Sequence, residues 1–166
     1  SHLAAHVCQD ARVGHYVARI QSSGEHLLGI VNDILDLSRI EAGKLRIDVA
    51  EFALDTLLAN VCGIVAERAE AKGLELIIDV APGLPERLFG DAKRIGQILI
   101  NFANNAVKFT EHGEVVLHVD GSNRDGERIG LRFAVEDTGI GIAADKLPLL
   151  FSPFQQLDAS MSRQFE

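Results

Sequence analysis

The chain has 166 residues, enough for one ordinary domain with an appended segment, and 47% of them are hydrophobic, which suffices for a packed core. Its formal net charge of −8 supplies no basic stripe for phosphates, so we expect no nucleic-acid partner. Cys8 and Cys62 lack CxxC spacing and indicate reduced thiols. No apolar run spans a bilayer and no signal peptide is present, which predicts a cytoplasmic chain without membrane contact and leaves a membrane-anchored parent open.

The first predicted element is a long helix over residues 11–40. Its apolar residues recur at helical spacing, and Gly43 follows as a left-handed cap. The stripe contains Val13, Val17, Ile20, Leu27, Leu28, Val31 and Leu35. A lone helix with one apolar face must bury that face against a partner.

From residue 45 onward the pattern alternates between strands and helices. The expected elements, in chain order, are a strand over 46–52, a helix capped by Asp55 and running to about Lys72, a strand over 74–80, a helix opened by Asp91 and ending near Phe109, a hairpin of 114–120 with 129–135, and a brief helix over 147–151. This order predicts the α/β class: an α/β sandwich with a mostly antiparallel sheet and its helices on one face.

One polar constellation lies in the helix segment NFANNAVKF, residues 101–109. Asn101, Asn105 and Lys108 are spaced i, i+4 and i+7, so they share one face, while Phe102 and its apolar neighbours are expected to point toward the core. Amide oxygens suit a hydrated Mg²⁺, and a lysine suits a phosphate. An ordinary solvated helix face is the alternative.

Two further motifs follow in the sequence. EDTGIGI, residues 136–142, comes directly after a strand; Gly139 and Gly141 permit close approach of a flat ligand, and Asp137 can accept a hydrogen bond from an exocyclic amine. An ordinary glycine turn is the alternative. FSPFQQ, residues 151–156, places two aromatic residues around a proline and by itself suggests a core anchor.

In their order and spacing, these three motifs resemble the N, G1 and F boxes of the sensor histidine kinases. The ATP-binding domain of that family belongs to the group shared with Hsp90, DNA gyrase and MutL. The similarity extends to residues 21–28, 32–44 and 90–99, and so covers nearly the whole chain from about residue 10. It implies an incomplete helical dimerisation and phosphoacceptor segment over 1–44, and a C-terminally incomplete ATP-binding domain over 45–166.

The resemblance implies ATP and Mg²⁺ as cofactors and a role for each matching residue. These roles are Mg²⁺ coordination for Asn105, phosphate contacts for Asn101 and Lys108, recognition of the adenine amine for Asp137, the lining of the base pocket for Gly139 and Gly141, the anchor of a mobile lid for Phe154, and a phosphate contact for Arg163.

The resemblance also implies an ATP-dependent protein-histidine kinase of a two-component system. ATP-hydrolysing relatives carry a glutamate base at the position of Asn101, and an amide cannot take a proton at neutral pH, which favours phosphoryl transfer over hydrolysis. The implied partners are a second copy, paired through the N-terminal helices as a four-helix bundle, and a response-regulator receiver domain. A non-catalytic regulatory module and an ATPase of the same fold stay as alternatives.

The sequence departs from the family pattern in two places. The acceptor motif, a Ser-His-Glu followed by an Arg-Thr-Pro-like run, is not matched: His2 is followed by Leu3, and His6, His15 and His26 lack the motif. Two explanations stay open: Ser1 and His2 are a remnant in front of a truncated helix, or residues are missing after His2. Because the second explanation would restore the motif, His2 stays a candidate acceptor. The second glycine-rich box, expected after Glu166, is absent, so we expect the chain itself to be impaired or inactive.

Overall fold

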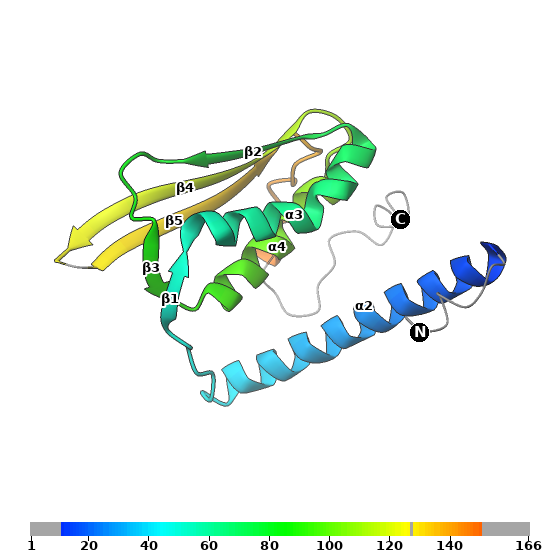
Figure 1. Ribbon diagram of the computed structural model, residues 1–166, viewed down its shortest axis with the longest axis horizontal. Coiled ribbons are helices and arrows are strands. Elements are labelled where there is room, and N and C mark those ends of the chain that lie inside the picture. The colour runs from blue at the N-terminus through cyan, green and yellow to red at the C-terminus, as the bar shows by residue number, and fades with distance from the viewer. Residues whose placement is uncertain (1–10, 127, 151–166) are drawn as a thin grey trace. The chain divides into compact units, whose positions relative to one another are not determined.

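The computed structural model describes residues 11–126 and 128–150 and divides the chain into two compact units, residues 1–47 and 48–166. In the first unit, α2 (Ala11–Glu41) is a single helix of 31 residues (Figure 1). The helix ends at Glu41, and Gly43 follows as the predicted left-handed cap, with a φ of 63° and its N–H donated to the carbonyl of Ile40. Apolar side chains along α2 stay exposed, among them Ile20, Leu27, Leu28, Ile34 and Leu35.

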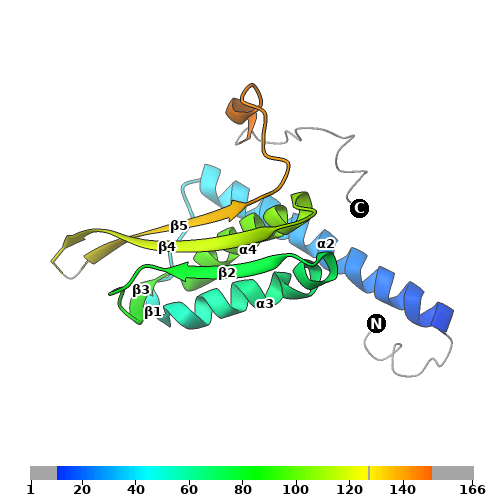
Figure 2. The same cartoon turned by 90° about the horizontal axis from the view of Figure 1, so that it is seen from above.

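The second unit is an α/β sandwich, which confirms the predicted fold class. Its sheet has the order β2-β4-β5, formed by β2 (Glu75–Val80), β4 (Glu114–Asp125) and β5 (Arg128–Asp137). β4 pairs with β5 antiparallel and with β2 parallel. The helices α3 (Leu54–Lys72) and α4 (Ala92–Phe109) cover one face of this sheet (Figure 2).

A second, two-stranded sheet accompanies the first. β1 (Ala50–Ala53) and β3 (Arg87–Gly90) pair antiparallel, with Phe52 opposite Leu88. The strand expected over 46–52 is therefore shorter and later, and β3 was not predicted. The hairpin strands are longer than expected, and the brief helix near residue 147 is a 3-10 turn, η1 (Leu147–Leu149).

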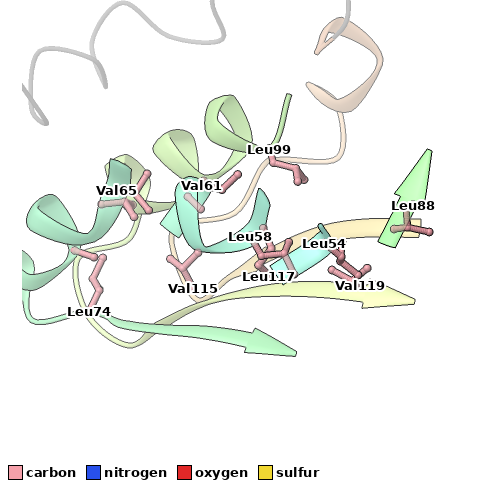
Figure 3. Close-up of a cluster of buried hydrophobic side chains, with 14 residues drawn as sticks. Leu54, Leu58, Val61, Val65, Leu74, Leu88, Leu99, Val115, Leu117 and Val119 are labelled. Carbon is pink, nitrogen blue, oxygen red and sulfur yellow. The ribbon is translucent and has the colours of Figure 1, made fainter. Parts of the chain in front are cut away.

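The core lies between the helices and the inner face of the sheet (Figure 3). Successive side chains of a strand point to opposite faces, so every second residue of β4 enters the core. The buried side chains include Val61 and Val65 of α3, Leu99 of α4, and Val115, Leu117 and Val119 of β4. Burial of this apolar surface fixes α3 and α4 against the sheet and thereby positions the ends of α4 and β5.

The two helices of this unit begin in different ways. Asp91 caps α4 as predicted, because its carboxylate accepts the backbone N–H of Arg94 at 3.1 Å. The prediction that Asp55 caps α3 was wrong: Ala53 occupies the N-cap without a side-chain bond, and the Leu54 N–H donates to the carbonyl of Glu86. Contact with a neighbouring segment therefore replaces the local cap at α3.

Asp91 should make stability depend on pH. The backbone N–H groups of Asp48 and Arg94, with the charge of the Arg94 guanidinium, hold the pKa of its carboxyl below the ordinary value. The resulting stabilisation is fully present above about pH 4 and is lost as the pH falls through the lowered, folded-state pKa. We expect the melting temperature of Asp91→Asn to fall less steeply than that of the parent between about pH 7 and pH 3.

Thermal melts followed by circular dichroism measure this difference, with Asp145→Asn as the control because Asp145 is exposed. Parallel pH profiles for the parent and Asp91→Asn would contradict the assignment.

Among the helices that the structure describes, none is long and apolar enough to cross a membrane.

Candidate functional site

The end of α4 meets the loop that follows β5. Gly139 is half-buried, and a Cβ placed on it would run into the backbone carbonyl oxygen of Phe109. The same Cβ would lie 2.8 Å from Asp137 Oδ1 and 2.9 Å from Thr110 Oγ1. Because a backbone oxygen cannot rotate away as a side chain can, only glycine allows this approach. The structure thus brings together the two motifs at residues 101–109 and 136–142.

Hydrogen bonds hold this loop on both sides. The Ile140 N–H donates to the carbonyl of Phe109 at 3.4 Å, and the Thr138 N–H donates to the carbonyl of Glu114 at 3.2 Å. The Thr138 hydroxyl accepts the N–H of Glu114 at 3.0 Å and donates to the carbonyl of His112 at 3.2 Å. The loop is therefore tied to α4 and to the start of β4 before any ligand is considered.

Asp137 is the last residue of β5 and pairs with Val115 of β4. Alternation along the strand places its side chain on the same sheet face as Val135, the face that α3 and α4 cover. Its side chain is exposed, and Oδ1 accepts the N–H of Gly139 at 2.9 Å. The loop thus orients the carboxylate and leaves further lone pairs for a ligand donor.

The polar face of α4 is present as predicted. Asn101 and Asn105 are exposed and Lys108 is half-buried, with its Nζ 5.5 Å from the centre of the Phe109 ring. The expectation that Phe102 points into the core was wrong, because 47% of that residue is exposed. Helical spacing places Phe102 beside Asn105 at i+3 and beside the buried Ala106 at i+4, and so at the edge of the polar face.

The remaining predicted site residues are Gly141, His2, Phe154 and Arg163. Gly141 follows in the same loop with a φ of 66° and open space around its Cα. His2, Phe154 and Arg163 lie outside the described residues. The roles predicted for them stay predictions.

Sequence reasoning missed three residues at this junction. Thr138 ties the loop to β4, and Thr110 is fully buried against Gly139, with a hydroxyl that has no hydrogen-bond partner within the described part of the chain. The Lys72 ammonium donates to three carbonyl oxygens at the end of α4. The sequence carries one signal at Lys72: a lysine directly before a glycine is typical of a helix C-terminus. That signal does not indicate the bonds to α4.

Hollows open on the described part of this unit. One of about 160 Å³ is lined by Asp137, Thr138 and residues of the outer sheet face, so it adjoins the loop. The other, of about 380 Å³, lies by Phe52 and Lys93 at the opposite end of α4, away from the predicted residues. Within residues 11–126 and 128–150, no group of three histidine, cysteine or carboxylate side chains could hold a metal by itself.

Two family models match this chain. The His Kinase A (phospho-acceptor) domain matches residues 2–43, and the histidine kinase-, DNA gyrase B- and HSP90-like ATPase matches residues 90–166. The sensory/regulatory protein RpfC of Xanthomonas campestris is 44% identical over 160 residues, which cover 95% of this chain and 22% of RpfC. The chain belongs to the sensor histidine kinase family.

Solved structures agree with this membership. Full-length ShkA in complex with AMPPNP is 39% identical to this chain, with a TM-score of 0.74 over 96% of this chain and 33% of ShkA. Histidine kinase ThkA, solved in complex with the response regulator protein TrrA, is 23% identical and shows the fold alone, with a TM-score of 0.61 over 91% of this chain and 42% of ThkA. This chain therefore spans about a fifth of RpfC and a third of ShkA.

Proposed function

We propose that this chain is the core of an ATP-dependent protein-histidine kinase in a cytoplasmic two-component system. It binds Mg-ATP and transfers the γ-phosphoryl group to a histidine, from which a response-regulator aspartate receives it. The observation that carries the proposal is the close approach of Gly139 to the end of α4, which joins a base-reading carboxylate to a polar helix face. ATP binding also agrees with the matching ATPase family model and with the AMPPNP complex of ShkA.

Asp137 reads the base in this proposal. Its carboxylate is exposed and oriented by the Gly139 N–H, so it can accept a second hydrogen bond from the exocyclic amine of adenine. Gly139 and Gly141 keep side chains away from the base. Lys108 places one positive charge beside the phosphates at the end of the same helix. Phe154 anchors the lid, and Arg163 adds a phosphate contact.

The donor set of α4 fits Mg²⁺ held chiefly by nucleotide phosphates and water. Asn105 and Asn101 present exposed amides, and Mg²⁺ keeps several waters when it is bound with a nucleotide. Asn105 would hold the ion, and Asn101 would lie beside it near the phosphates. When bound, Mg²⁺ neutralises charge on the transferred phosphoryl group.

The residue at position 101 favours the kinase over an ATPase of the same fold. An asparagine cannot accept a proton from water at neutral pH, whereas an imidazole attacks phosphorus as a neutral nucleophile and needs no such base. His2 is the candidate acceptor in this chain. A non-catalytic regulatory module remains the second alternative, because His2 lacks the family's acceptor motif.

The proposed partners are a second copy of the chain and a receiver domain. α2 exposes 67% of Ile20, 62% of Leu27 and 65% of Leu28, and a helix with such a face gains stability by burying it against another helix. The matching phospho-acceptor model over residues 2–43 agrees with a dimer built from these helices. The complex of ThkA with TrrA supports a response regulator as the downstream partner.

Phosphoryl transfer is tested by incubating a longer protein that contains this chain with ATP labelled in its γ-phosphate. We expect label in the protein that is lost in acid and kept in base, as phosphohistidine requires, because Asn101 leaves hydrolysis without its base. A malachite-green assay on the same sample measures free phosphate. Release of free phosphate without labelled protein would identify an ATPase, and neither product would identify the regulatory module.

A further inference from the structure

Lys72 occupies an unusual position at the end of α3. Its half-buried ammonium donates to the carbonyl oxygens of Val107 at 2.7 Å, Lys108 at 2.8 Å and Thr110 at 3.0 Å. An ammonium group has three N–H donors, and these three carbonyls match them in number. All three acceptors belong to the end of α4, which is also the segment against which Gly139 packs.

These bonds complete the C-terminus of α4. The last four carbonyls of any α-helix lack partners within the helix. In α4, the carbonyl of Ala106 accepts the Thr110 N–H, and that of Phe109 accepts the Ile140 N–H from the loop. Lys72 satisfies the two between them, those of Val107 and Lys108. Its positive charge also opposes the negative end of the helix dipole.

The end of α3 fixes the direction of Lys72. Gly73 adopts the left-handed conformation, with a φ of 67°, and donates its N–H to the carbonyl of Glu70. The next N–H, from Leu74, returns to the carbonyl of Ala69, and the Leu74 side chain is buried in the core. This closing turn holds Lys72 on the last turn of α3, against α4.

We infer that Lys72 is a positioning residue for nucleotide binding, acting through the last turn of α4 and the loop at residues 137–141. The inference rests on the proposed function. Without the ammonium, two helix carbonyls and that of Thr110 lose their donor, and the turn that carries Lys108 loosens. The bond from Ile140 to Phe109 then weakens, and with it the placement of Asp137.

The test compares Lys72→Met, Lys72→Gln and Lys72→Arg in the full chain. Isothermal titration with Mg-ADP, below the unfolding transition of every variant, should show about tenfold weaker binding for the Met and Gln variants. Lys72→Arg keeps the positive charge but presents its N–H donors in a planar group, so it should recover only part of the affinity. Lys93→Met is the matched control, since this exposed lysine lies at the other end of α4.

Leu88→Ala distinguishes the positioning role from a general loss of stability, because it removes a core side chain of β3 and lowers the melting temperature. It should keep its affinity for Mg-ADP at the same temperature. Equal affinity losses in Leu88→Ala and Lys72→Met, or parental affinity in Lys72→Met, would overturn the inference.

Amide hydrogen exchange of Ile140 keeps the inference testable apart from the proposed function. Exchange should speed up in Lys72→Met and stay at the parental rate in Lys93→Met, without any nucleotide present. If the parental chain binds no nucleotide, the proposed function fails for this chain, whereas an unchanged Ile140 exchange rate overturns the role of Lys72.

Discussion

Replacing Asp137 by asparagine should lower the affinity for Mg-ADP by about 100-fold, because a charged acceptor is lost and an amide donor then faces the adenine amine. The fold should persist, since the asparagine oxygen can still accept the Gly139 N–H that Asp137 accepts at 2.9 Å. Isothermal titration measures the affinity, and circular dichroism verifies the fold.

Glu136→Gln is the matched control for this substitution. Glu136 is the adjacent carboxylate, but its side chain lies on the outer face of the sheet, 3.4 Å from His118 Nε2. Inosine diphosphate sharpens the test, because it carries a carbonyl in place of the amine and should lose little affinity on Asp137→Asn. Unchanged ADP affinity, or equal losses of ADP and inosine diphosphate, would reject Asp137 as the residue that reads the base.

Gly139→Ala should both destabilise the fold and weaken Mg-ADP binding by about 100-fold, because overpacking forces the loop off the end of α4. The added Cβ collides with the carbonyl oxygen of Phe109, which can move only with the last turn of the helix. We expect the melting temperature to fall by about 10 °C, measured by differential scanning calorimetry.

Gly63→Ala is the control for the effect of the methyl group itself. Gly63 lies in the interior of α3, and an added Cβ would meet nothing within 4 Å. Alanine favours the helix there by up to about 1 kcal/mol, so the melting temperature should rise slightly and binding should not change. A Gly139→Ala protein that binds and melts like the parent would show that the loop can leave α4 without cost.

Sequence patterns predicted those elements that local signals define. The helical period and the capping Asp91 predicted where α4 begins, and Gly43 predicted where α2 ends. Sequence patterns failed where contact with another segment of the chain determines the structure. β3 follows Pro85 and has only four residues, so its pairing with β1 stabilises it rather than its own pattern. The helix start at Leu54 depends likewise on the carbonyl of Glu86.

The candidate site shows the same division. Spacing placed Asn101, Asn105 and Lys108 on one face, but it also placed Phe102 in the core, since an apolar residue beside an apolar stripe gives no sign of exposure. The approach of Gly139 to Phe109 joins segments about 30 residues apart, and the reach of Lys72 to α4 spans a similar stretch. Periodicity indicates a face and does not identify the partner on it.

The parallel pairing of β2 with β4 governs how this unit assembles. A parallel pair cannot close through a tight turn, and here β3 and α4 lie in the chain between the two strands. The end of α4 and the loop after β5 therefore meet only after a long segment has crossed over, at an entropic cost that contacts within one helix or one hairpin do not carry. Peptides that contain α4 or the loop alone lack this crossover, so the junction on which the proposed nucleotide binding depends exists only in the folded unit.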